Sequence, residues 1–178
     1  MDILAVLLNV LGVALAMTSS LWKKATMKQI LLLICGANLL IATSYLFQGE
    51  GINGAVSCYL AFVMAIVNYL FQSKNKPIPK WLIGIYALSF VAVNLVSNGF
   101  NLYTLLAVAA ALFFVASLLQ SAGKGYRFCS IFNMAIWSTY DILVGAYAAL
   151  LTHSILLIVN LTGMILYDLK KKKEYVKN

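Results

Sequence analysis

Charged residues are scarce in this sequence, and their scarcity excludes a water-soluble domain. Only 10% of the 178 residues are charged, and 63% are hydrophobic. A soluble domain is normally about 25% charged. Apolar runs long enough to span a bilayer fill nearly the whole chain and leave no stretch for a soluble domain. The composition therefore predicts an all-α, polytopic membrane protein.

Metal-ligating residues and catalytic motifs are also lacking. The sequence has one histidine, His153, and one acidic residue well inside an apolar run, Asp141, which are too few for an ordinary metal site. Three isolated cysteines, Cys35, Cys58 and Cys129, show no spacing typical of a zinc site or a redox pair. There is no P-loop, nucleophile elbow or zinc-protease motif. We therefore expect no enzyme activity, no metal and no cofactor.

The cations that are present follow a simple pattern. The thirteen Lys and Arg residues fall in four clusters separated by apolar runs: Lys23, Lys24 and Lys28; Lys74, Lys76 and Lys80; Lys124 and Arg127; and Lys170–Lys173 with Lys177. Cytoplasmic loops carry an excess of Lys and Arg. All four clusters lie on one side if the chain crosses the membrane seven times, with its N-terminus outside and its C-terminus in the cytoplasm. The net charge of +8 then indicates contact with anionic membrane lipid, not nucleic acid.

Seven spanning helices are expected from this pattern. They are predicted at about residues 3–21, 29–47, 52–72, 81–98, 102–120, 128–146 and 150–168. The first run has no basic n-region and is longer than a signal-peptide core, so it is predicted to be a retained helix. The fifth loop, Ser121 to Arg127, is expected in the cytoplasm, and the sixth, around Tyr147 to Ala149, outside.

The two halves of the chain resemble each other. Asn38-x5-Ser44-Tyr45 in the second run matches Asn133-x5-Thr139-Tyr140 in the sixth. The match predicts two parallel three-helix bundles joined by a linker helix. Residues 1–73 would form the first bundle, 74–100 the basic loop and linker helix, and 101–178 the second bundle with the basic tail. Small-residue pairs such as Gly12-x3-Ala16 predict close helix packing, and such faces would also permit a homo-oligomer.

Polar side chains in the apolar runs are the candidate binding residues. Four of them in the sixth run, at i, i+4, i+7 and i+8, share one helix face. Amides donate and accept hydrogen bonds and aromatic rings stack, which suits a neutral polyhydroxylated or heteroaromatic solute. The alternative is that the amides only join helices, at about 0.6 kcal/mol per hydrogen bond. The predicted binding residues are Asn38, Tyr45, Asn68, Asn133, Trp137, Tyr140 and Asn160, with Asp141 completing the shared face.

Asp141 and His153 lie at similar depths from the outer surface and are predicted to face each other. Intramembrane ionisable groups are typically functional, so the pair is a candidate gate or proton site. The alternatives are a plain structural hydrogen bond and exposure to the outer headgroups. Asp168 lies at the cytoplasmic end of the last run, where it is expected to meet Lys170 or its neighbours.

The spacing Trp137-x3-Asp141-x3-Gly145, followed by His153 and Asn160, resembles the YgjV-type bacterial inner membrane protein family. That resemblance implies location in the bacterial inner membrane. The expected architecture is also similar to that of the SWEET and PnuC-type transporters, with three helices, a linker helix, three helices and an outside N-terminus.

The likeness to SWEET proteins implies roles for particular residues. Trp137 and Asn160 would flank a central solute, with Asn68 or Asn38 facing them from the first half, which has no matching Trp. SWEET helices also contain prolines as hinges, whereas the two prolines here are both in the loop around residues 77–79. The favoured function is a small-solute transporter or facilitator that works by alternating access. The alternative is a non-transporting sensor, scaffold or accessory subunit.

Overall fold

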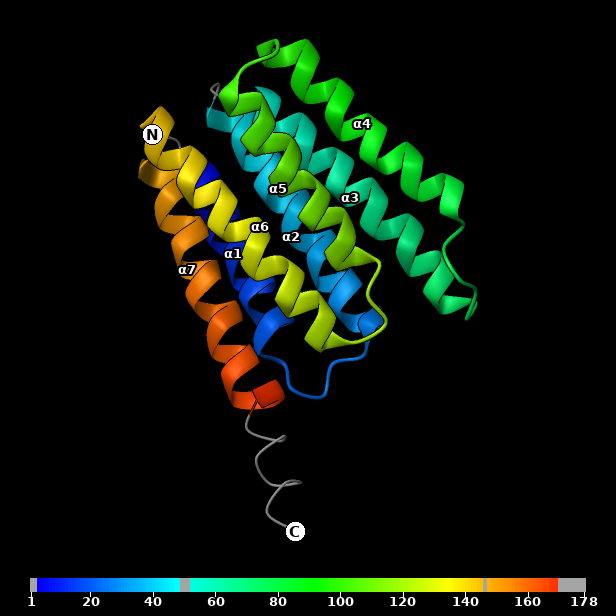
Figure 1. The fold of residues 1–178 in the computed structure, drawn as a ribbon. Coiled ribbons are helices and arrows are strands. Elements are labelled where there is room, and N and C mark those ends of the chain that lie inside the picture. Colours follow the sequence, from blue (N-terminus) through cyan, green and yellow to red (C-terminus); the bar gives the residue numbers. More distant parts are fainter. Residues whose placement is uncertain (1–2, 49–51, 146, 170–178) are drawn as a thin grey trace.

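A computed structural model describes residues 3–48, 52–145 and 147–169. Within these ranges the chain is all-helical, as predicted, and contains seven α-helices and a π-helical turn, η1 (Figure 1). Four segments are long and apolar enough to cross a membrane by length and composition, and α4 and α5 are shorter apolar helices. The elements are α1 (Ile3–Leu21), α2 (Met27–Gln48), α3 (Ile52–Ser73), α4 (Lys80–Asn98), α5 (Leu102–Leu118), α6 (Gly123–Val144), α7 (Tyr147–Gly163) and η1 (Met164–Leu169).

The bounds of the last two helices differ from the prediction, since α7 also begins at Tyr147 and not at about residue 150. Helix α6 begins at Gly123, so Lys124 and Arg127 lie on the helix and not in the preceding loop. The helix can start early because the buried Arg127 side chain pairs with the side-chain carboxylate of Asp168 in η1. The outer turn was expected around residues 147–149, but α6 already ends at Val144 because Gly145 adopts the left-handed conformation, with φ 73° and ψ 21°.

The helices form a closed ring in chain order. Each helix packs against the next one along the chain, and α7 packs against α1. Helix α2 therefore lies between α1 and α3, and α6 lies between α5 and α7 (Figure 1). Helix α4 packs on α5 and, over a smaller area, on α3. Residues far apart in sequence thus meet where α1 contacts α6 and α7.

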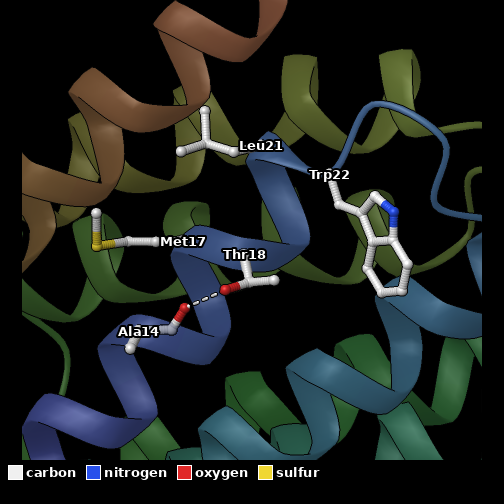
Figure 2. A pocket seen from close by; sticks show the side chains of 5 residues that line it. All are labelled: Ala14, Met17, Thr18, Leu21 and Trp22. Atoms are coloured by element: carbon white, nitrogen blue, oxygen red, sulfur yellow. Dashed lines mark hydrogen bonds between the residues drawn. The ribbon is translucent and has the colours of Figure 1, made fainter.

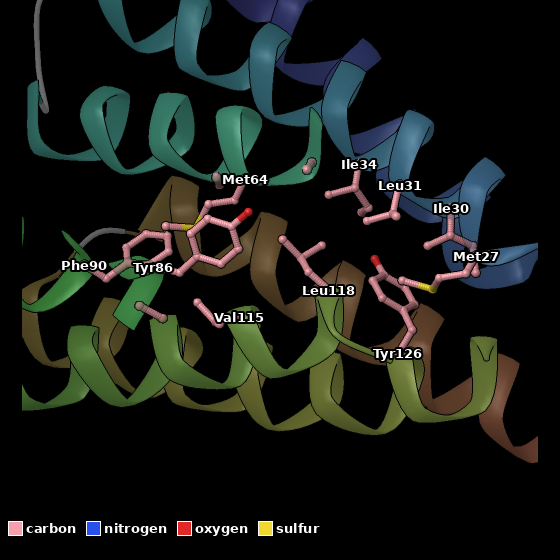
Figure 3. Packing of buried hydrophobic residues seen from close by; sticks show 13 residues of the cluster. Met27, Ile30, Leu31, Ile34, Met64, Tyr86, Phe90, Val115, Leu118 and Tyr126 are labelled. Carbon is pink, nitrogen blue, oxygen red and sulfur yellow. The ribbon is translucent and has the colours of Figure 1, made fainter. Parts of the chain in front are cut away.

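Apolar side chains fill the interior of the ring. Ile30 and Leu31 from α2, Met64 from α3 and Leu118 from α5 are each at most 1% exposed and belong to one cluster (Figure 3). Tyr86 and Tyr126 bring α4 and α6 into the same cluster. Lipid tails are as apolar as these side chains, so the cluster stabilises the fold through close van der Waals packing, not through removal from water.

Glycine allows close packing between α1 and α2, as the sequence predicted. A Cβ atom added to Gly12 would lie 2.6 Å from the Ile41 side chain and 3.1 Å from the carbonyl oxygen of Ala37. Ala16, one turn further along α1, belongs with Ala37 and Leu156 to a second, smaller buried cluster. The small residues therefore bring α1 close to α2 and, through Leu156, to α7.

The described cations gather at one end of the ring, here called the basic end. Lys28 donates to the Asn75 side chain at 3.3 Å, which joins the start of α2 to the loop after α3. Arg127 donates to the Ser20 carbonyl oxygen at 3.3 Å, which places the start of α6 beside the end of α1. The first three cation clusters therefore share this end (Figure 1). The fourth, Lys170–Lys173 with Lys177, lies outside the described residues. The opposite end is here called the far end.

Candidate functional site

The contact expected between Asp141 and His153 is present at the far end. Asp141 Oδ2 lies 2.6 Å from His153 Nδ1. The Asp141 side chain is almost fully buried, with 3% of its surface exposed, whereas 19% of the His153 side chain is exposed. An ionised carboxylate can only accept a hydrogen bond, so Nδ1 carries the hydrogen when Asp141 is charged. The pair joins α6 to α7, about one turn before Gly145 ends α6.

Three aromatic rings lie in a row beside this pair. The Trp137 ring stacks on the His153 ring, with centroids 5.7 Å apart and planes 17° apart. Tyr140 meets Trp137 edge-on at 5.3 Å, and Tyr103 from α5 meets Tyr140 edge-on at 6.3 Å. Stacked and edge-on geometries are the favourable ones for aromatic pairs. Tyr103, Trp137, Tyr140, Asp141 and His153 are here called the far-end cluster.

The far-end cluster was mostly predictable. Three of its members occupy one face of α6 because positions 137, 140 and 141 are one helical turn apart. Tyr103 was missed. The sequence signal for it was its position in the first turn of α5, since tyrosine is enriched where helices leave the membrane.

Two of the predicted binding amides contact neighbouring helices away from the far-end cluster. Asn133 is 3% exposed, and its Nδ2 donates to the Ala110 carbonyl oxygen of α5 at 2.6 Å. Asn68 is fully buried. The Tyr86 hydroxyl donates to its Oδ1 at 3.1 Å, and its Nδ2 donates to the Leu118 carbonyl oxygen at 3.5 Å. Each amide thus joins helices in this conformation.

The remaining predicted residues lie elsewhere again. Asn160 accepts a hydrogen bond from the Ser20 hydroxyl at 2.8 Å, near the basic end, and its Nδ2 donates to a carbonyl oxygen of its own helix. Asn38 donates to the Ile34 carbonyl oxygen, four residues earlier in α2, at 2.9 Å. Tyr45 belongs to α2, but its side chain lies outside the described residues. The predicted binding residues whose side chains are described are therefore distributed along the ring, and among them Trp137 and Tyr140 adjoin the ionisable pair.

A buried ion pair at the basic end was not predicted. Asp168 was expected to meet Lys170 or its neighbours, which lie outside the described residues, and the structure pairs its carboxylate with Arg127. Nε and Nη2 of Arg127 donate to the two carboxylate oxygens at 2.9 and 2.8 Å. The guanidinium carbon lies 5.7 Å from the centre of the Tyr167 ring. Arg127 is the single arginine of the chain, and arginine is the cation best suited to a buried two-point contact with a carboxylate. The presence of one arginine among twelve lysines was therefore the sequence feature that could have predicted this pair.

Hydroxyl groups extend the polar contacts at this end. Ser19 and Tyr126 are buried, and their hydroxyl oxygens lie 3.1 Å apart. Arg127 contacts the neighbouring Ser20 carbonyl oxygen. Helices α1 and α6 are thus joined through polar groups at the same end at which Arg127 holds η1.

Two open hollows lie on the outer surface of the ring. One has a volume of about 440 Å³ and follows α1 along Ala14, Met17, Thr18, Leu21 and Trp22 (Figure 2). The Thr18 hydroxyl donates to the Ala14 carbonyl oxygen at 2.8 Å, so it offers no hydrogen to a ligand. The other hollow, of about 310 Å³, is lined by Val56, Ala92, Val93 and Val96. Neither hollow is lined by a predicted binding residue.

The sequence matches one known family over nearly its whole length. The Imp-YgjV family, described as a bacterial inner membrane protein, matches residues 3–171. The chain belongs to this family. The family resemblance seen in the sequence is thus confirmed, and this Imp-YgjV protein is a bacterial inner membrane protein. No curated protein and no solved structure matches the chain. Three of the residues that carried the resemblance, Trp137, Asp141 and His153, meet in the far-end cluster.

Proposed function

We propose that this Imp-YgjV protein is a small-solute transporter or facilitator, and that the far-end cluster is its outer gate. The observation that carries the proposal is the hydrogen bond between the buried Asp141 carboxylate and the partly exposed His153 ring. Ionisable groups within membrane helices are costly and typically belong to solute or proton pathways. Histidine readily changes its charge near neutral pH. A proton gained or lost at this pair would alter the contact that joins α6 to α7.

The chemistry of the far-end cluster indicates the class of solute. Ring faces of Trp137 and Tyr140 would stack on a flat or polyhydroxylated molecule, while the His153 and Asp141 polar atoms would bind its hydroxyl or amide groups. A neutral sugar, nucleoside or vitamin fits this combination. We propose that the basic end faces the cytoplasm, and that α1–α3 and α5–α7 rock against each other to expose the solute alternately. Asn133 would then line the path between the two ends.

A ligand screen followed by uptake tests this proposal. Purified protein is heated with sugars, nucleosides or vitamins, and a compound that binds the folded state raises the melting temperature. Compounds that do so are then tested for uptake into proteoliposomes. We expect Asp141→Asn to reduce uptake. Thr162→Val is the matched control, because the exposed Thr162 hydroxyl only contacts the Ile158 carbonyl oxygen of its own helix. Equal uptake by wild type and Asp141→Asn would remove the gate from the proposal.

A second function is favoured by the filled interior of the ring. Core side chains occupy the space between α2, α3 and α5, and the amides of Asn68, Asn133 and Asn160 all contact protein groups. A sensor, scaffold or accessory subunit needs no solute path and would have this packing. Asn133→Ala separates the two readings. Transport predicts loss of solute binding by a protein that still folds, whereas a purely structural amide predicts a small loss of stability alone.

A further inference from the structure

Helices α6 and α7 are joined by a polar side-chain contact at each end. Asp141 meets His153 at the far end, and Arg127 meets Asp168, on the turn that continues α7, at the basic end. The two α6 residues are separated by roughly 20 Å along the helix at 1.5 Å per residue. Helix α6 supplies the carboxylate of one pair and the cation of the other. Each pair can therefore hold one end of the α6–α7 contact independently of the other.

The basic-end pair lies in a closely packed setting. Only 6% of the Arg127 side chain and 8% of the Asp168 side chain are exposed. Arg127 also reaches the Ser20 carbonyl oxygen, and the Ser20 hydroxyl donates to Asn160. A Cβ atom on Gly163 would lie 2.8 Å from the Ser20 carbonyl oxygen and 3.0 Å from Arg127 Cδ. In this conformation the contact between α1, α6 and α7 is therefore closed at the basic end.

Stability alone is a poor reason for such a pair. Replacing a buried ion pair by apolar residues of similar size is often neutral or stabilising, because both charges must leave water. Asp168 also lies in the π-helical turn Met164–Leu169, and π-turns are frequent at functional sites. A carboxylate on an irregular turn, against an arginine on a regular helix, suits a contact that forms and breaks.

We propose that the Arg127–Asp168 pair is the inner gate of the transporter, and that it opens only while the Asp141–His153 pair stays closed. This proposal rests on the proposed transport function. Separation of Asp168 from Arg127 would free η1 from α6, and the polar groups of Ser20 and Asn160 would then face the cytoplasm. The two side-chain pairs would thus provide the two closures that alternating access requires.

Two thiol reporters test the inner gate without a known solute. Cys129 is native, buried and two residues after Arg127, so it reports opening at the basic end once Cys35 and Cys58 are replaced by Ala. Ser138 serves the far end as Ser138→Cys. Its hydroxyl oxygen is buried and has no hydrogen-bond partner among the described residues, so the substitution removes no hydrogen bond seen there. Each reporter is placed alone, with Cys129→Ala in the second case, and labelled by a membrane-impermeant thiol reagent in vesicles of either orientation.

We expect Arg127→Gln to raise the rate of Cys129 labelling from the cytoplasmic side at least about tenfold, equivalent to about 1.4 kcal/mol. Labelling of the Ser138→Cys reporter should not rise. Asp141→Asn should raise labelling of the Ser138→Cys reporter and leave the Cys129 rate unchanged. Arg127→Lys keeps the charge but loses the two-point contact, so it should give an intermediate Cys129 rate. If Arg127→Gln does not fold, Asp168→Asn replaces it, with the same expectation.

Two results would overturn the inner gate. A parallel rise at both reporters would mean general loosening of the bundle, and an unchanged Cys129 rate would mean that the Arg127–Asp168 pair does not hold the basic end closed. Neither result depends on finding a solute. If a compound is taken up by wild type while Cys129 stays unreactive in every variant, the transport function survives and the gate fails. If the reporters respond reciprocally but nothing is transported, the gate motion stands and the transport function fails.

Discussion

Gly163 provides a sharp test of the packing at the basic end. A Cβ atom there would lie 2.8 Å from the backbone oxygen of Ser20, whereas ordinary van der Waals contact begins at 3.4 Å. A backbone oxygen cannot rotate away as a side chain can, so Gly163→Ala must push α7 from α1. Overpacking of this kind costs about 1–3 kcal/mol. Alanine also favours a helix over glycine by about 0.5–1 kcal/mol, which offsets part of that cost.

Gly84 in α4 is the matched control, because a Cβ atom added there meets nothing within 4 Å. Gly84→Ala should therefore gain the helix-propensity term alone. The difference between the two variants isolates the overpacking term, about 1–3 kcal/mol. A change of 1 kcal/mol shifts the melting temperature of a chain of this size by about 2–4 °C. Gly163→Ala should therefore melt at a lower temperature than Gly84→Ala when both are heated in the same detergent and unfolding is monitored by tryptophan fluorescence. If Gly163→Ala is as stable as Gly84→Ala, α1 and α7 are not in the described contact.

Three further substitutions test the polar contacts through the same melting measurement. Asn68→Leu should lower the free energy of unfolding by about 1–3 kcal/mol because it leaves the buried Tyr86 hydroxyl without its acceptor. Adding Tyr86→Phe should recover most of the loss, and a double variant no more stable than the single one would contradict this. Asn133→Ala should cost only about 0.6 kcal/mol, since the Ala110 carbonyl oxygen belongs to a regular helix, and a loss above 2 kcal/mol would be inconsistent with that contact. Thr18→Val should stay within about 0.5 kcal/mol of wild type, because the Thr18 hydroxyl only contacts its own helix.

The helices could be predicted because hydropathy and charge report where a chain enters and leaves the bilayer. The predicted bounds of the first five helices agree with the structure to within about two residues. The start of α6 was missed for a physical reason. Arg127 was assigned to water with the other cations, but its partner is Asp168, 41 residues later. Hydropathy considers one segment at a time, so it cannot show that a distant carboxylate allows a charged residue to enter the bundle.

The contact between Asp141 and His153 could be predicted because only a short turn separates α6 from α7. Residues at equal distances from such a turn lie at the same depth. The partners of the asparagines depend on a different quantity, the rotation of each helix about its own axis. Asn133 faces Ala110 of α5, while Asn160 faces Ser20 of α1. Neither a shared spacing nor a shared depth determines that rotation, because it follows from the packing of the whole ring.

Lysine and arginine therefore have different roles in this chain, although the sequence pattern predicted the same cytoplasmic location for both. Lys23, Lys24, Lys74 and Lys124 are exposed at the basic end, where a strongly hydrated ammonium group is stable in water. Arg127 lies in the same region but is 5% exposed and paired with a carboxylate, so its charge is neutralised within the bundle. The predicted orientation consequently follows from the lysines alone, whereas loss of Arg127 would remove the polar contacts that join η1 to α6 and the start of α6 to Ser20.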